Sequence, residues 1–180
     1  MRYWLSLRAL GTLVSGFALM AQSQAHSGDA PCVLSRADVR IHCPSDWNLI
    51  EESGRETIIG NYVRSSDTPE HVFGGPGRAF LSFMTIPTSY KDLAEWLVAA
   101  RKTAPKAAED MLTVSNREIV ARTVTRFSAP AGPGSRYASY FFQVGPTPVL
   151  LELTYRIDDP KKDEYQSALL AMIEGAELAK

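Results

Sequence analysis

The segment RYASYFFQVGPTPVLLELTYRI, residues 136–157, decides the fold because it contains two alternating stretches separated by a turn. Its second half places Leu151 and Leu153 on one side of an extended chain and Glu152 on the other. The first half alternates in the same way, and the turn-forming residues GPTP occupy 145–148. The sequence therefore predicts a central antiparallel hairpin with its apolar residues on one face. The expected cross-strand pairs are Val144 with Val149, Phe142 with Leu151, Tyr140 with Leu153 and Ala138 with Tyr155.

The patterns outside this hairpin predict further strands and two helices. Alternating or continuous apolar runs indicate strands over residues 37–43, 47–51, 57–65, 79–86 and 117–129. Ser89 and Asp92 fit a capping box for a first helix, with one further helical turn over 107–112. A second helix is expected after Asp159, which would serve as its N-cap with Pro160 at the first helical position. Each helix carries one apolar stripe, so the sequence predicts an α+β fold in which two helices pack on one antiparallel sheet.

A resemblance supports this prediction. The phrase IHCPSDW at 41–47, with its Pro-x-x-Trp turn, the order of the elements and the last helix after a long hairpin resemble the PsbP/Mog/DcrB-like superfamily over residues 37–178. The resemblance implies an α/β/α sandwich around a curved antiparallel sheet. Its members include a photosystem extrinsic subunit, a Ran-binding import factor, bacterial envelope proteins and chaperones of secreted toxins. It therefore implies a protein that binds another protein, and it carries over no catalytic residue.

The first 25 residues have the features of an export signal. Arg2 and Arg8 provide a basic start, and the apolar run at 10–21 is too short to span a bilayer. Small residues end the segment at Ala25, after which we expect cleavage. A single α+β domain over 26–180 would remain, located in the periplasm or secreted. The alternative is an uncleaved membrane anchor.

The charge balance limits the class of partner. The full chain carries a net charge of −1, and cleavage of the signal peptide would leave about −3. Binding to nucleic acid or to anionic lipid depends on an excess of basic residues, so we expect neither partner. No second apolar segment is long enough to span a membrane, so no span is expected after cleavage.

Cys32 and Cys43 are the two cysteines of the chain, and both follow the signal segment. An isolated pair in an oxidising compartment is more often a disulfide than a metal or redox site. We expect this disulfide to attach the N-terminal segment to the first strand.

Two loops rich in Gly and Pro, residues 66–78 and 130–136, are the expected contact region, because binding residues concentrate on loops held by a rigid scaffold. The candidate binding residues there are Glu70, His71, Phe73, Arg78 and Arg136. The alternative interpretation is a small hydrolase or metal-dependent enzyme with an acid/base group at His71.

Three further features have two interpretations each. His26 would become the N-terminal residue and could chelate copper together with His42 or His71, although the chain has too few histidines to favour this. Phe141 packs under the second helix or forms a binding surface. Arg117, Arg122 and Arg126 are edge-strand charges or line an anion-binding face.

The sequence as a whole favours an exported, non-enzymatic envelope protein without a cofactor. The expected partner is another envelope protein or a small apolar ligand.

Overall fold

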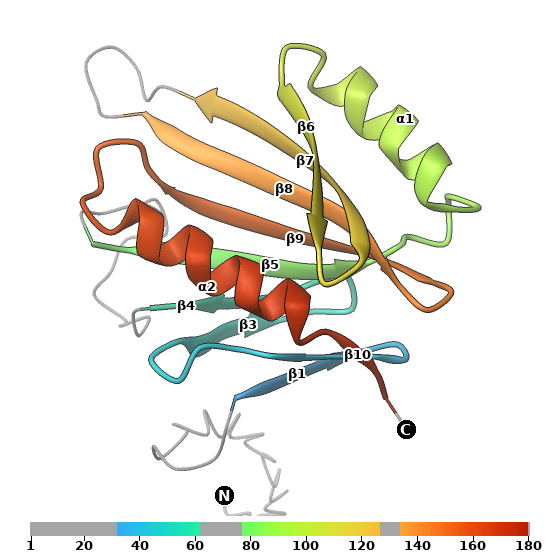
Figure 1. Cartoon of the computed structure of the whole chain (residues 1–180), viewed down its shortest axis with the longest axis horizontal. Helices are drawn as coiled ribbons and strands as arrows, with labels where there is room; N and C mark the ends of the chain where they lie inside the picture. The colour runs from blue at the N-terminus through green and yellow to red at the C-terminus, as the bar shows by residue number, and fades with distance from the viewer. Residues whose placement is uncertain (1–31, 62–76, 127–133, 180) are drawn as a thin grey trace, which may run out of the picture.

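The computed structural model describes residues 32–61, 77–126 and 134–179, and it has the predicted α+β class. Within these residues the strands form a seven-stranded and a three-stranded sheet, and neither closes into a barrel (Figure 1). The sequence predicted one sheet, so the second sheet is a correction. The two helices are α1 (Leu93–Thr103) and α2 (Lys162–Glu174).

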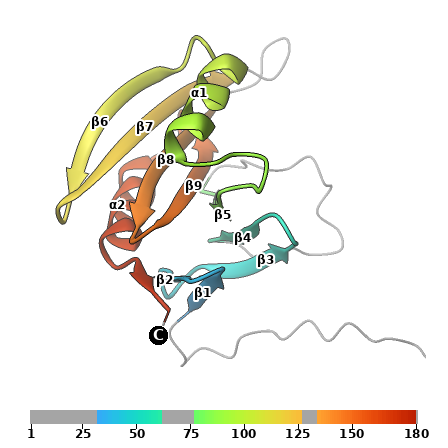
Figure 2. The same cartoon turned by 90° about the vertical axis from the view of Figure 1, so that its right-hand side faces the viewer.

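The large sheet is antiparallel throughout and bends along its length, with its last strands curving away from the first (Figure 2). Its two faces are covered by different helices: Tyr140 and Leu153 belong to the core that contains α2, whereas Phe141 belongs to a smaller core with Trp96 of α1. The predicted sandwich of helix, sheet and helix is therefore present. In spatial order the strands are β3 (Asn48–Glu52), β4 (Thr57–Gly60), β5 (Ala79–Thr85), β9 (Thr147–Arg156), β8 (Ser135–Val144), β7 (Arg117–Arg126) and β6 (Ala108–Val114).

The central hairpin β8–β9 has the predicted faces but a different register. Val144 pairs with Thr147, and Ala138 with Leu153, so the turn is Gly145–Pro146 and every predicted pair is displaced by two residues. Gly145 adopts φ +58°, which suits the glycine position of a tight two-residue hairpin turn. A shift of two residues keeps each side chain on its own face, so the core prediction survives the register error.

The first helix begins three residues later than predicted, because its N-cap is Asp92 and not Ser89. Asp92 is the N-cap and accepts a hydrogen bond from Glu95 N at 2.9 Å, and the Glu95 carboxylate accepts one from Lys91 N at 2.7 Å. The predicted helical turn at 107–112 is wrong, because residues 108–112 belong to β6. Every residue of β6 except Val114 is exposed, so the strand shows no alternation that could identify it.

The second helix does not use Asp159 as its N-cap. That position is taken by Lys161, which makes no side-chain capping bond. Asp159 is instead a buried carboxylate, 2% exposed, that accepts hydrogen bonds from Gly77 N at 2.7 Å and from Lys161 N at 2.9 Å. The Asp159 side chain thus holds the start of α2 and Gly77, two residues before β5, together.

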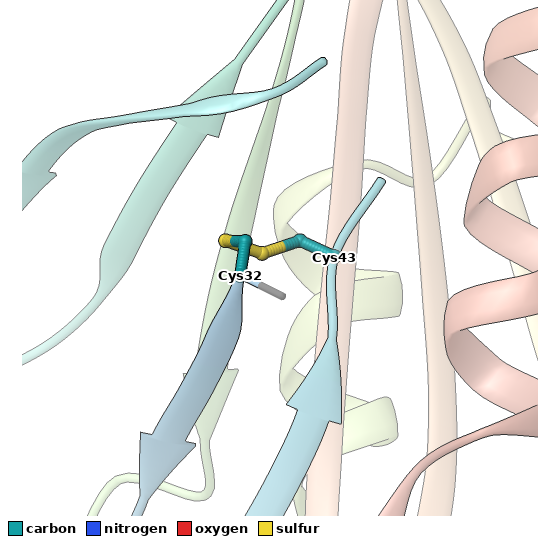
Figure 3. The surroundings of a disulfide bond; sticks show 2 residues. All are labelled: Cys32 and Cys43. Atoms are coloured by element: carbon teal, nitrogen blue, oxygen red, sulfur yellow. A yellow bond between two sulfur atoms is a disulfide. The ribbon is translucent and has the colours of Figure 1, made fainter. Parts of the chain in front are cut away.

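The small sheet consists of β1 (Val33–Arg36), β2 (Val39–His42) and β10 (Glu177–Leu178). The predicted strand at 37–43 is therefore shorter, and Ala37 lies in a turn after a strand that the sequence did not reveal. The disulfide between Cys32 and Cys43 is present, with the two Cα atoms 5.2 Å apart (Figure 3). It closes the open end of the β1–β2 hairpin, so it joins two strands and not a lead-in segment to a strand.

Side-chain and backbone contacts connect the two sheets. Arg36 donates from Nη1 to Gly54 O at 3.0 Å, and Thr147 Oγ1 donates to Asp38 Oδ1 at 2.5 Å. The C-terminal strand β10 lies beside β2 and reaches the β8–β9 turn, where Leu178 faces Gly145 (Figure 1). Neither helix in the described residues has the length and apolar character that crossing a membrane requires.

Candidate functional site

The predicted loop site is only partly described. Glu70, His71 and Phe73 lie outside the described residues, and so does the alternative enzyme site around His71. Arg78 and Arg136 are described, and both are partly buried. Tyr155 on β9 pairs with Arg136 on one side and with Ala79 on the other. Arg78, which precedes Ala79, and Arg136 therefore reach the same end of the large sheet.

Hydrogen bonds organise this end of the sheet. Asn61 accepts from Ala79 N at 2.8 Å and donates to Gly77 O at 3.0 Å. The Tyr165 hydroxyl donates to the Asp159 carboxylate at 3.4 Å, and burial, followed by the charge of Asp159, raises the pKa of Tyr165. Tyr165 therefore stays a neutral donor, and the network holds Asn61, Gly77 and Asp159 together at this end of the sheet.

A cleft of about 290 Å³ lies on the other face of the sheet, beneath α1. Its floor is formed by β7, β8 and β9, and its wall by one side of the helix, where small side chains leave space. The aromatic ring of Trp96 packs edge-on against Phe141, with ring centroids 5.4 Å apart, and closes the apolar end. The remaining lining residues that matter here are Tyr90, Ala99, Ala104, Arg122, Arg126, Tyr137, Ser139, Leu150 and Glu152.

Register explains why this cleft has one apolar and one polar half. An apolar row crosses five strands in the order Met111, Val120, Phe141, Leu150, Met84. The next row on the same face has the order Glu109, Arg122, Ser139, Glu152, Ser82. Helix α1 packs on the first row and leaves the second to line the cleft.

Arg122 is the buried cation of the polar row, with 6% of its side chain exposed. Its Nε donates to Glu109 Oε2 at 3.1 Å, and its Nη2 donates to Ala104 O at 2.8 Å. Glu109 also binds Arg101, whose hydrogen bonds are the largest influence that holds the pKa of Glu109 below its usual range. The ionised Glu109 fixes Arg122 in place, and Nη1 of Arg122 has no hydrogen bond among the described residues.

Arg126 adds a second cation on the same face of β7. Its guanidinium carbon lies 4.8 Å from the centre of the Tyr137 ring, an arrangement that favours a cation over the aromatic face. Tyr137 pairs with Val124, so this stacking brings the exposed Arg126 head back along the strand toward Arg122.

Glu152 is the anion at the opposite side of the cleft. It is partly buried and accepts a hydrogen bond from Ser139 Oγ at 2.7 Å. No cation contacts it among the described residues. A partly buried carboxylate without a cation is less stable than a paired one, so this position favours a positively charged or hydrogen-bond-donating group from a ligand.

The sequence missed this site and misjudged some of its parts. The three arginines do not share a face, because Arg117 contacts the end of α2 while Arg122 and Arg126 face α1. Arg117 and Arg122 are also not at a sheet edge, since β6 pairs with residues 117–123 of β7. Phe141 packs under the first helix and not under the second. The alternation of β7, β8 and β9 assigns their side chains to the two faces of the sheet. Only the register across these three strands places Arg122 and Glu152 in one row.

Other positions are less suited to holding a ligand. A wider hollow of about 670 Å³ lies between the β3–β4 turn and the segment that joins β5 to α1, but its charged lining residues are only Arg36 and Arg55. Among the described residues, no three His, Cys, Asp or Glu side chains are grouped so that they could hold a metal ion. His42 is exposed, and the other two histidines proposed for copper, His26 and His71, lie outside the described residues.

Comparison with known proteins gives a likeness of fold. No known family matches the chain, and no curated protein sequence does. A structure from Bacteroides thetaiotaomicron VPI-5482 superposes with a TM-score of 0.50 at 14% identity and covers 79% of this chain, which spans 46% of that longer chain. Protein PA94 of unknown function from Pseudomonas aeruginosa has a TM-score of 0.46 at 12% identity, with coverage of 79% and 95%. LpqN from Mycobacterium tuberculosis, described as involved in cell envelope biogenesis, has a TM-score of 0.46 at 18% identity, with coverage of 85% and 87%.

At these identities the similarity is one of fold, and it assigns no function to this chain. The relation to the PsbP/Mog/DcrB-like superfamily stays a prediction.

Proposed function

We propose that this protein is an exported, non-enzymatic binding protein of the bacterial envelope whose ligand occupies the cleft beneath α1. The observation that carries the proposal is the composition of the cleft: an apolar floor and wall meet two cations and a carboxylate that no described cation contacts. A mostly apolar pocket with a few convergent polar groups is the usual form of a small-molecule site.

Export is supported by the disulfide, because such bonds persist mainly in proteins that leave the reducing cytosol. The location in the periplasm or outside the cell, after cleavage near Ala25, completes the proposal. The predicted alternative, a hydrolase or metal-dependent enzyme near His71, stays a second candidate that the described residues do not address.

The direct experiment maps binding on the ¹⁵N-labelled protein with three probes that share one apolar body: indole-3-propionate, indole-3-propionamide and tryptamine. The indole ring suits the aromatic lining, and the three head groups are anionic, neutral and cationic. We expect at least one probe to shift the amide resonances of Ala100, Arg122 and Ser139 in a saturable way. Shifts confined to another part of the surface, or no shift with any of the three, would contradict the proposed site.

A further inference from the structure

We propose that the ligand of this cleft is a short zwitterionic peptide, about three residues long, bound with its carboxylate toward β7 and its amino group toward β9. This inference rests on the proposed function and specifies the class of its ligand. It starts from the two charges of opposite sign that the polar row presents to the same space.

The cation side consists of Arg122 and Arg126. Arg122 is held by Glu109 and by the carbonyl of Ala104, so its Nη1, which bonds to none of the described residues, is oriented in advance of binding. A preorganised guanidinium loses little conformational entropy when it binds a carboxylate. Arg126, stacked on Tyr137, supplies further N–H donors at the rim.

The anion side is Glu152, whose described partner is a neutral hydroxyl from Ser139. An ammonium group at this position would supply the missing countercharge and several hydrogen-bond donors. A ligand that carries only a negative charge would satisfy the arginines and leave Glu152 uncompensated. A ligand that carries only a positive charge would compensate Glu152 and leave Arg126 and Nη1 of Arg122 without an anionic partner.

The spacing selects the length of the ligand. Arg122 on β7 and Glu152 on β9 are separated by one intervening strand, which places their backbones about 10 Å apart. An extended peptide of three residues spans about the same distance. Ser139 lies between the two charges in the polar row, and Phe141 and Leu150 of the neighbouring apolar row border this space. Ala99 lines it from the helix, so an apolar central side chain can pack toward the apolar row.

The test compares three forms of one peptide by isothermal titration calorimetry on the whole domain: Ala-Leu-Ala, its N-acetyl form and its C-terminal amide. Each modification removes one charge and leaves the apolar body unchanged. We expect the free peptide to bind about tenfold tighter than either modified form.

Two variants assign the charges to residues. Glu152→Gln keeps the size of the side chain and removes its charge. It should reduce the affinity for the free peptide to that which the parent protein has for the N-acetyl form. The affinity for the N-acetyl form itself should change by less than twofold. Arg126 is exposed, so we expect Arg126→Gln to keep the fold. It should weaken binding of the free peptide more than binding of the amide. Arg122→Gln would extend the test only if its circular dichroism spectrum matches that of the parent.

The outcomes separate this inference from the proposed function. Equal affinities for the three peptides would overturn the inference that the ligand is zwitterionic, and the cleft would remain a binding site. Binding of the indole probes without binding of any peptide would also overturn it and leave the proposed function in place. If neither the peptides nor the indole probes bind, both fail.

Discussion

Arg117 connects the β6–β7 hairpin to the C-terminal end of α2. Its guanidinium donates to the carbonyls of Ile173 and Ala176, and to Glu174 O at 3.2 Å. Ile173 and Glu174 end the helix and Ala176 follows it, so these bonds hold the helix C-terminus, and a cation there also complements the helix dipole. This contact could not be predicted from the sequence, because a residue on β7 and a helix end more than fifty residues later meet only in the fold.

We therefore expect Arg117→Ala to lower the free energy of unfolding by about 1 to 3 kcal/mol, since partly buried carbonyls lose their donors. Arg40→Ala is a matched control, because 42% of the Arg40 side chain is exposed and its ion pair with Glu177 is 4.0 Å long. The control should change stability by less than about 0.5 kcal/mol. Urea denaturation of both variants measures the difference, and equal losses would contradict the capping function.

Gly145 is constrained in two ways. Its φ of +58° lies in the left-handed region, and a Cβ atom there would come within 2.8 Å of Leu178 Cδ1. Gly145→Ala should cost about 1 to 2 kcal/mol from backbone conformation alone, plus the cost of displacing Leu178. In a Leu178→Ala background the second contribution should disappear, and thermal unfolding of the four proteins of this cycle measures it. If Gly145→Ala costs the same in both backgrounds, the turn does not lie against β10.

At the scale of elements, the disulfide closes the open end of the β1–β2 hairpin, which also packs into the main core through Val39 and Ile41. The small sheet has only three short strands, and β10 contributes two residues to it. Replacing both cysteines by alanine should lower the free energy of unfolding by about 3 kcal/mol, the value for a short closed loop in the chain-entropy model. Guanidinium denaturation of the parent, with and without reductant, gives an independent measurement. A double variant as stable as the oxidised parent would show that other contacts hold the hairpin.

Strand β6 is an unprotected sheet edge. Met111 is 64% exposed and Leu112 is 36% exposed, and an exposed edge strand promotes association between chains. We expect Met111→Lys to slow aggregation at elevated temperature, as followed by light scattering. Val98→Lys is the control, because Val98 is 47% exposed on α1, where no strand edge is present. Equal effects of both substitutions would mean that surface charge, and not the edge, controls aggregation.

These elements also show what can be predicted from the sequence. The faces of β8 and β9 followed from their period of two, because the face toward α2 is the main core and the face toward α1 carries a smaller apolar cluster beside polar residues. Their register did not, since Thr147 and Pro148 are typical turn residues and yet belong to β9. Strand β6 could not be identified because neither of its faces is buried. The cleft depends on pairing between β7, β8 and β9, which no local pattern specifies.

At the scale of the whole molecule, export is a prediction that can be tested directly. Expression of the full chain in a Gram-negative host should give a periplasmic protein that begins at His26 and contains the oxidised Cys32–Cys43 pair, as shown by mass spectrometry. Ala25→Phe removes the small residue that signal peptidase requires and should leave an unprocessed precursor. A parent chain recovered only in the membrane fraction with Met1 intact would support the uncleaved anchor.

The measurement that tests the central claim most directly is the affinity of the best of the three indole probes for two variants of α1. Ala99 lines the cleft, whereas its neighbour Val98 points to solvent. Ala99→Leu fills the cleft and should weaken binding at least about tenfold, because overpacking leaves no room for the probe. Val98→Phe, which enlarges the side chain by at least as much one residue away, should leave the dissociation constant within twofold. Equal dissociation constants for the parent and both variants would show that the ligand does not bind beneath α1.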